Sequence, residues 1–151
     1  MSLVWTQDGS GSYEISSAEH LLQLMNQGTL YTDTGTSPTE YYSSSFVQTV
    51  DVDLASHHAN IKPINGLSAF SGSYDGNLYK ISNWSYSSTD TTENVGLFGF
   101  LAGPAKRIRL SGTWSLSSAR LAGFLAGQTS GDILILKLTS RREPLSLIQA
   151  Q

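Results

Sequence analysis

Asp51 and Asp53 are the residues best placed to carry out acid–base or cation chemistry. They lie two positions apart in the alternating segment Thr49-Val-Asp-Val-Asp-Leu54, so on a strand their carboxylates share one face, about 7 Å apart. Paired carboxylates can bind a cation or exchange protons with a substrate. No third acid or positioned histidine completes such a site in the sequence. We therefore expect a solvated outer face, on which Lys80 of a neighbouring strand pairs with Asp51.

The histidines are a second candidate group. His57 and His58 are adjacent, and adjacent residues of an extended chain point to opposite faces, which makes a shared metal ion difficult to bind. His20 lies far from them, in a segment with helical periodicity. The chain contains no H-E-x-x-H, G-x-S-x-G or phosphate-loop motif. Asp75-Gly76-Asn77 lacks the alternating acids of a calcium loop and predicts a turn. We expect neither a metal site nor a cofactor.

The third group consists of aromatic residues: Trp84, Tyr86, Trp114, Tyr13, Tyr31, Tyr41 and Tyr42. Aromatic rings on the face of a sheet can stack on sugars, which leaves a carbohydrate-binding module open as a function. The alternative is lateral packing of these rings beneath a long loop. Asn83-Trp-Ser85 also matches the N-glycosylation pattern, which we interpret as a chance match at a strand edge.

Composition favours a single β-rich domain. The chain has 151 residues, enough for one domain with its own core. It contains 24 Ser, 13 Thr and 14 Gly, which favour strands and turns, and it has no cysteine. A net charge of −3 shows no nucleic-acid signature, and no apolar stretch approaches the ~20 residues of a membrane-spanning helix. Residues 1–9 have neither the basic nor the apolar region of a signal peptide, which predicts a soluble protein that begins at Met1.

Charge is distributed unevenly along the chain. Residues 1–61 contain seven acids and no Lys or Arg, whereas residues 62–151 contain nine basic residues and five acids. The two parts therefore carry charges of −7 and +4. This pattern indicates either two differently charged ends of one domain or head-to-tail association steered by opposite charges.

One helix is predicted near the N-terminus. Ser16 and Glu19 form a capping-box pattern, and Gly28 supplies a C-terminal stop. Residues 29–45 are too polar for a core and predict a long loop. We expect the apolar face of the helix to cover the exposed edge of the first strands. That face consists of Ala18, Leu21, Leu22 and Met25.

Alternating apolar segments follow from Phe46 onward. Their central residues are Val52, Ile81, Leu110 and Ile135, which recur at nearly equal steps along the chain. Between these segments, residues 95–99 resemble residues 122–126, separated by a step of similar length. In the first segment Val50, Val52 and Leu54 should share the buried face.

A repeat with one strong strand per period of roughly 25–29 residues predicts a solenoid. An antiparallel sandwich, the competing interpretation, needs turn signals at intervals of about 8–12 residues, and few are present. We expect the four central residues to stack about 4.8 Å apart, the spacing of parallel strands. Leu97 and Phe124 should form a second stack.

Residues 70–99 resemble the GLUG-type β-helical repeat family. Phe70-Ser-Gly-Ser-Tyr-Asp-Gly-Asn77, Ile81-Ser-Asn83 and Val95-Gly-Leu-Phe-Gly99 are similar to the family pattern F-x-G-x-x-D-G-N, I-x-N and V-G-L-F-G. Residues 15–22, 50–54 and 61–64 resemble the helix, strand and turn that precede it, so the similarity spans about residues 13–139. The chain departs from the pattern at Asn65, before Gly66, and at residues 122–126.

The resemblance implies a short right-handed parallel β-helix of about four coils with an N-terminal α-helical cap. The expected single domain spans residues 1–151, with the cap helix and long loop at 1–45, the coils at 46–139 and a tail at 140–151. Polysaccharide lyases of similar architecture use several acids and a basic residue. The nearest equivalents are Asp51, Asp53, Lys80 and Arg109, too few acids for such a groove. We therefore expect no enzymatic activity.

The family occurs in bacterial surface and adhesin-like proteins and in structural proteins of large DNA viruses. Residues 107–114 followed by residues 122–127 are closer to the viral copies. The resemblance thus implies a non-catalytic structural or assembly protein in the virion, either a minor capsid protein or a vertex-associated one. The alternative is a surface adhesin or glycan-binding module at the cell surface.

The C-terminal end predicts a protein contact. Residues 133–138 are the most apolar run after residue 128, and the segment after them is too short for another coil. Pro144 interrupts that segment, and no second capping helix is predicted. Leu145, Leu147 and Ile148 could fold back across the last strand. Otherwise residues 131–151 contact another chain, either a second copy or another structural protein.

Overall fold

The computed structural model describes residues 5–26, 38–64, 69–88, 94–116, 121–122, 126–129 and 133–143. These residues form one α-helix, α1 (Ala18–Met25), two 3₁₀ helices, η1 (Pro38–Ser43) and η2 (His58–Asn60), and eleven strands. None of the helices in these ranges has the length and apolar character needed to cross a membrane.

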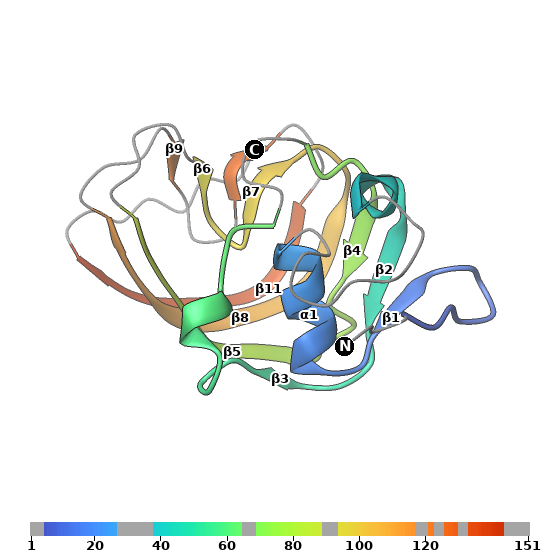
Figure 1. The fold of residues 1–151 in the computed structure, drawn as a ribbon, viewed down its shortest axis with the longest axis horizontal. Coiled ribbons are helices and arrows are strands. Elements are labelled where there is room, and N and C mark those ends of the chain that lie inside the picture. The colour runs from blue at the N-terminus through green and yellow to red at the C-terminus, as the bar shows by residue number, and fades with distance from the viewer. Residues whose placement is uncertain are drawn as a thin grey trace.

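Seven strands form one parallel sheet, in the order β1-β2-β4-β8-β5-β3, with β11 paired to β8. Their bounds are β1 Tyr13–Ile15, β2 Ser45–Gln48, β3 Val52–Asp53, β4 Ser73–Asp75, β5 Lys80–Ser88, β8 Ala105–Leu116 and β11 Ile133–Glu143. The remaining strands form two parallel pairs, β6 (Asn94–Val95) with β9 (Leu121–Ala122) and β7 (Phe98–Leu101) with β10 (Ala126–Thr129). The main sheet curls around these short strands as a half-barrel (Figure 1).

The expected right-handed β-helix of about four coils is wrong. The described strands make one curled sheet, and the strands that face it form only two separate pairs. Strand β8 explains the difference, because its first residues pair with β4 and its later residues pair with β5. Arg107, between these two regions, has a φ of 54°, so β8 bends there without ending. A corner that would separate two sheets of a β-helix thus becomes curvature within one sheet.

The lateral alignment of the central apolar residues is partly as expected. Val52 pairs with Ile81, and Ile81 pairs with Leu110. The next residue in this row is Leu138 instead of Ile135, which pairs with Ile108. The difference arises from two register shifts between residues 134 and 137, which one-dimensional spacing does not reveal.

The second repeat is aligned as its spacing in the sequence predicts, since Val95 pairs with Ala122. Phe98 pairs with Ala126 in the neighbouring strand pair. Phe124, the expected partner of Leu97, lies outside the described residues.

The alternation of residues 49–54 is only partly confirmed. Val52 and Leu54 are buried, whereas Val50 is 36% exposed. Strand β3 begins only at Val52, so Val50 precedes the segment in which alternation holds.

The α-helix begins one residue later than the capping-box pattern predicts. Ser17 is the N-cap, and its Oγ accepts a hydrogen bond from the N–H of His20, 3.2 Å away. The N–H of Ser16 instead donates to Nδ1 of His20 at 3.2 Å. The predicted stop, Gly28, lies outside the described residues.

The buried face of α1 is wider than expected. Ala18 is half-buried, and the fully buried residues are Leu21, Leu22, Gln23, Leu24 and Met25. The side-chain amide of Gln23 has no hydrogen-bond partner among the described residues. The face that was expected to be apolar therefore includes a buried polar group, which destabilises the fold.

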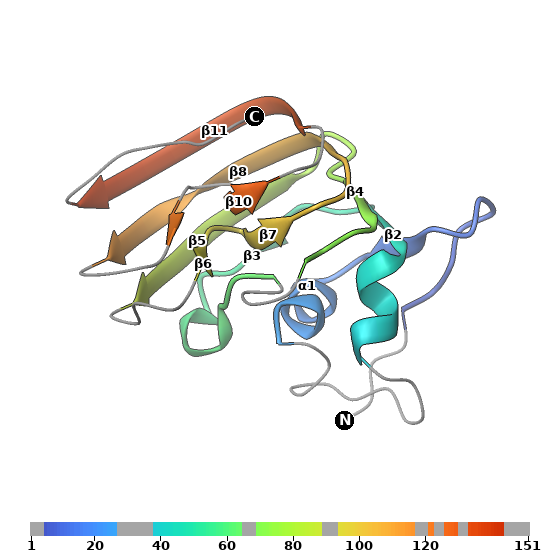
Figure 2. The same cartoon turned by 90° about the horizontal axis from the view of Figure 1, so that it is seen from above.

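The two ends of the main sheet differ. The N-terminal segment folds back beside β1, where the N–H of Glu14 donates to the carbonyl of Thr6 at 2.8 Å and Gln7 bridges Tyr13. Helix α1 lies toward this end, and β11 forms the opposite end (Figure 2). Strand β11 extends to Glu143, so residues 140–143, expected in a tail, belong to the sheet.

Candidate functional site

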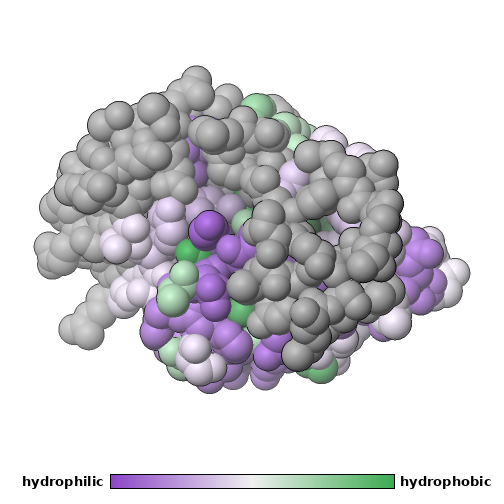
Figure 3. Space-filling model, in the orientation of Figure 1, coloured by the Kyte–Doolittle hydropathy of each residue, from purple (hydrophilic) through white to green (hydrophobic). Residues whose placement is uncertain are grey.

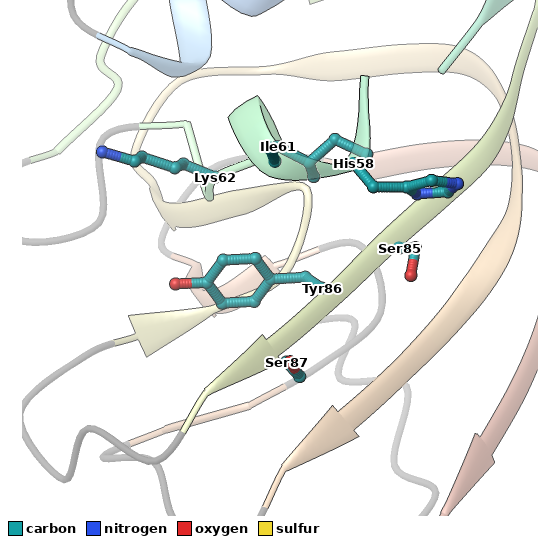
Figure 4. Close-up of a pocket in the computed structure, with 7 residues that line it drawn as sticks. His58, Ile61, Lys62, Ser85, Tyr86 and Ser87 are labelled. Carbon is teal, nitrogen blue, oxygen red and sulfur yellow. The ribbon is translucent and has the colours of Figure 1, made fainter. Parts of the chain in front are cut away.

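An open cleft of about 360 Å³ lies between η2 and β5 (Figure 4). It is lined by His58, Ala59, Ile61, Lys62, Ser85, Tyr86 and Ser87. This volume is within the range of small-molecule sites, about 300–1,000 Å³. The described part of the face shown in Figure 3 is mostly hydrophilic, with small separate hydrophobic spots.

Backbone hydrogen bonds hold the η2 side of the cleft. The N–H of His57 donates to the carbonyl of Leu54 at 3.0 Å, and the N–H of Asn60 donates to the carbonyl of His57 at 2.9 Å. Ile61 is only 3% exposed and anchors the end of η2 in the core. Lys62 follows this anchor and is exposed. The packed Ile61 therefore holds the backbone from which the Lys62 side chain extends.

Strand β5 supplies the other side of the cleft through Ser85, Tyr86 and Ser87. Trp84, directly before them, is fully buried, and its ring centroid lies 6.3 Å from that of Tyr86, with the planes 34° apart. Figure 4 shows Tyr86 and Lys62 extending toward the same side, with His58 nearer Ser85. The buried tryptophan thus supports the half-buried tyrosine ring at the cleft.

The chemistry of the cleft is that of a polar ligand site. Two serine hydroxyls can each donate and accept hydrogen bonds, and Lys62 offers an ammonium group. None of the seven lining residues carries a carboxylate. The set therefore suits a ligand that is rich in hydroxyl groups and carries an acidic group near Lys62.

The sequence indicated Tyr86 as a sugar-stacking candidate, whereas His58 was considered only for metal binding, a role that its adjacency to His57 disfavoured. Positions 58 and 86 are separated by about one period of the repeat. That spacing could have indicated that the two residues lie close together, although His58 belongs to η2 and Tyr86 to β5.

Three other aromatic candidates, Tyr13, Tyr41 and Tyr42, serve packing. Tyr13 and Tyr41 contact Trp5, with ring centroids 6.1 and 4.7 Å from it. Tyr42 is 5% exposed, and burial raises the pKa of its hydroxyl. Trp114 pairs through its backbone with Tyr86, and Tyr31 lies outside the described residues. The expectation of lateral packing thus holds for Tyr13, Tyr41 and Tyr42.

Asp51 and Asp53 are exposed and bind groups on the next strand. Oδ1 of Asp51 accepts the backbone N–H of Lys80 at 2.8 Å, where the sequence predicts a charge pair with its ammonium group. Oδ1 of Asp53 accepts hydrogen bonds from Nδ2 of Asn83, 2.8 Å away, and from the N–H of Ala55, 2.9 Å away. These hydrogen bonds lower the pKa of Asp53. The two carboxylates therefore connect neighbouring strands.

The basic residues of the lyase-like set lie on the same strands. Lys80 and Arg109 are lateral partners on β5 and β8. The guanidinium group of Arg109 donates from Nη1 to the carbonyl of Leu78 at 3.2 Å. Arg109 thus bonds the backbone of the turn between β4 and β5.

The histidines do not converge. Nε2 of His57 lies 4.0 Å from Oε1 of Glu19, whereas His58 lines the cleft. His20 caps the start of α1, and its partial burial lowers its pKa. No group of three or more potential metal-binding side chains occurs among the residues that the structure describes.

An ion pair at Asp75 was not evident from the sequence. Nε of Arg107 donates to Oδ1 of Asp75 at 2.8 Å, Nη2 of Arg107 bonds Oδ2, and Nζ of Lys106 lies 3.7 Å from Oδ2. Burial raises the pKa of Asp75, but the hydrogen bonds from Arg107 and the N–H of Asn77 outweigh it and lower the pKa overall. Asn77 and Leu78 have positive φ, which confirms the predicted turn. The turn joins two strands that both pair with β8, so it is not a hairpin.

A second candidate site is the outer edge of β11. This strand pairs with β8 on one side, and no described strand pairs with its other side. From Lys137 to Glu143 it pairs with residues 109–115 without a further register shift. A long regular strand with one unpaired side is a template for adding another strand.

The register fixes which backbone groups lie on that outer side. The N–H of Leu54 donates to the carbonyl of Ser82 at 3.0 Å, so Ser82 faces β3 and the preceding Ile81 faces β8. Laterally paired residues of a parallel sheet face the same direction, and successive residues alternate. Ile81 pairs with Leu110, and Leu110 pairs with Leu138. The backbone N–H and C=O groups of Leu138, Ser140 and Arg142 therefore point away from β8.

No family model, curated protein or solved structure matches this chain.

Proposed function

We propose that this chain is a non-catalytic structural protein that assembles with other chains by adding a strand to the outer edge of β11. The observation that carries the proposal is the regular segment 137–143, whose outward N–H and C=O groups have no described strand beside them. Unpaired backbone groups of a long edge favour pairing with another strand.

The roles of the charged residues support a structural protein. Asp51, Asp53 and Asp75 each accept hydrogen bonds from a residue on the next strand, namely Lys80, Asn83 and Arg107. Each contact joins neighbouring strands that are distant in the sequence. These three acids thus contribute contacts between strands, which is consistent with a structural role.

The proposed setting is the virion of a large DNA virus, in a minor capsid or vertex-associated position. Its support is the resemblance of residues 70–99 to GLUG-type repeats and the closer likeness of residues 107–114 and 122–127 to viral copies. Mass spectrometry of purified particles tests this setting. Recovery of the chain only from cell-surface fractions would favour the adhesin alternative.

The assembly proposal is tested by light scattering of the purified chain over a concentration series. The substitution Ser140→Pro removes an outward N–H and leaves the bonds to β8 intact, since proline is tolerated on edge strands. We expect the wild-type chain to assemble and Ser140→Pro to remain monomeric with unchanged stability. Ser140→Thr, which retains the N–H, should assemble like the wild type.

A third variant checks the direction of the backbone groups. Residue 141 faces β8 by alternation, so Arg141→Pro should lower the free energy of unfolding through loss of a ladder hydrogen bond. A wild-type chain that is monomeric at every concentration contradicts the assembly proposal.

A second candidate function, glycan binding, is favoured by the cleft between η2 and β5. The aromatic ring of Tyr86, the hydroxyls of Ser85 and Ser87 and the ammonium of Lys62 match an acidic sugar. Titration with D-glucuronate, monitored by amide chemical shifts, should perturb residues 58–62 and 85–87, with a smaller effect from D-glucose. Lys62→Gln should weaken this response and Lys106→Gln should not. Shifts that are absent, or that do not depend on Lys62, contradict this function.

A further inference from the structure

We infer that the partner strand at β11 is β11 of a second copy, paired antiparallel about a two-fold axis through Ser140. This inference rests on the proposed function and names its partner. It accounts for three features of the segment 137–143: its length, the direction of its backbone groups and its pattern of charges.

Head-to-tail stacking, which the −7 and +4 halves of the sequence allow, is disfavoured by the opposite end of the sheet. There, residues 6 and 7 already lie beside β1 through the Glu14–Thr6 hydrogen bond and the bridge from Gln7 to Tyr13. Strand β3, the other terminal strand, has only two residues. Neither edge offers β11 a free strand of matching length, whereas β11 of a second copy does.

The direction of the backbone groups limits the possible registers. In an antiparallel pair, two opposite residues exchange both hydrogen bonds only if both face the partner strand. The outward residues Leu138, Ser140 and Arg142 must therefore lie opposite outward residues of the second copy. Every register that pairs residues of odd and even number is excluded.

Charge selects among the remaining registers. With Ser140 opposite Ser140, Lys137 lies opposite Glu143, and the two-fold axis produces this pair twice. The register centred on residue 139 places Lys137 opposite Arg141, and those centred on residues 141 and 142 place two arginines opposite each other. Like charges directly opposite destabilise a strand pair. The register centred on residue 138 has no like pair, but it also has no opposite-charge pair.

The chosen register also uses the whole regular segment. The register shifts end at Lys137, and β11 ends at Glu143. Ser140 is the midpoint of this segment. A closed two-fold dimer covers both β11 edges and leaves neither free for further growth.

Cysteine cross-linking tests the register, and the absence of native cysteine makes every disulfide assignable. We expect Ser140→Cys to form a disulfide-linked dimer rapidly under mild oxidation, because directly opposite Cα atoms lie about 5.5 Å apart. Ser45→Cys, at an exposed position on β2, is the matched control and should remain uncross-linked.

Charge reversal supplies an independent readout by light scattering. Lys137→Glu should weaken the dimer about 2- to 30-fold, since both Lys–Glu pairs become like-charge pairs. Adding Glu143→Lys to that variant should restore the wild-type affinity.

The outcomes separate the two proposals. Larger or open-ended assemblies, or dimers in which Ser140→Cys fails to cross-link and the double charge reversal fails to restore affinity, overturn the two-fold register and leave strand addition at β11 standing. A chain that is monomeric at all concentrations overturns both.

Discussion

The hydroxyl of Tyr74 donates a hydrogen bond to Oε1 of Gln48, 3.2 Å away, and both side chains are completely buried. Nε2 of the same glutamine donates to the carbonyls of Val50 and Lys80, each at 2.9 Å. Gln48 therefore joins β2, β4 and β5 at the point where the main sheet curls. Burial raises the pKa of Tyr74, so the hydroxyl stays protonated and remains a donor.

Removing the Tyr74 hydroxyl should destabilise the protein. Tyr74→Phe leaves one buried oxygen of Gln48 with no donor, which costs about 1–3 kcal/mol in free energy of unfolding. Urea denaturation measures this difference. Tyr79→Phe is the control, because Tyr79 is 37% exposed, and its stability should equal that of the wild type. Equal losses at both positions would show that the hydrogen bond to Gln48 contributes nothing.

The same substitution at two buried glutamines should have opposite effects. Gln23 on α1 has no described hydrogen-bond partner, so Gln23→Leu should raise the free energy of unfolding by about 1 kcal/mol. Gln48→Leu should lower the free energy of unfolding by at least about 2 kcal/mol. The substitution leaves the carbonyls of Val50 and Lys80 and the hydroxyl of Tyr74 without their hydrogen-bond partner. Thermal and urea unfolding of the two variants measure both effects. A loss of stability in Gln23→Leu would contradict the prediction.

Asp75 should make stability depend on pH in the acid range. Its pKa lies below the ordinary value of 3.8 in the folded protein, so the unfolded chain binds more protons as pH falls. The stabilisation is present above about pH 4 and is lost as pH falls below 3.8 through the folded pKa. Asp75→Asn should flatten this loss in urea titrations that run from neutral pH into the acid range.

Two arginine variants check the source of that effect. Arg107→Gln removes the guanidinium that bonds Asp75. This variant should therefore also lose less stability than the wild type as the pH falls. Arg109→Gln removes a guanidinium that bonds a backbone carbonyl, so the free energy of unfolding should depend on pH as it does in the wild type. If Arg107→Gln loses as much stability at acid pH as the wild type, the effect does not come from this ion pair.

Gly103 should not tolerate a side chain. A Cβ at this position would collide with the carbonyl oxygen of Gly72 on the neighbouring strand layer. Gly103→Ala should therefore cost about 3 kcal/mol in free energy of unfolding, at the upper end for overpacking. Gly9→Ala, where nothing lies within 4 Å of the new Cβ, should be neutral. Denaturant unfolding of the two variants compares them directly.

The local elements of this protein follow from patterns in its sequence. Helical spacing predicted the helix that the structure places at Ala18–Met25, although its N-cap is Ser17 instead of the predicted Ser16. Alternation predicted strands at the segments of β3, β5, β8 and β11. The two equal steps from Val52 to Ile81 and from Ile81 to Leu110 aligned these residues correctly, because parallel strands joined by connections of equal length pair in register. These features depend on neighbouring residues and on spacing, which sequence displays directly.

The curvature of the sheet and the assembly of the site arise from contacts between segments that are distant in the sequence. Arg107 adopts a positive φ within β8, an uncommon conformation for a non-glycine residue, at the point where β8 changes its partner from β4 to β5. Register shifts around Leu136 replaced Ile135 by Leu138 opposite Leu110. The cleft lies between η2 and β5, which are separate in the sequence. The carboxylates of Asp51, Asp53 and Asp75 accept hydrogen bonds from residues on strands that are distant in the sequence. These outcomes depend on packing between distant segments, whose free energies no local pattern of residues encodes.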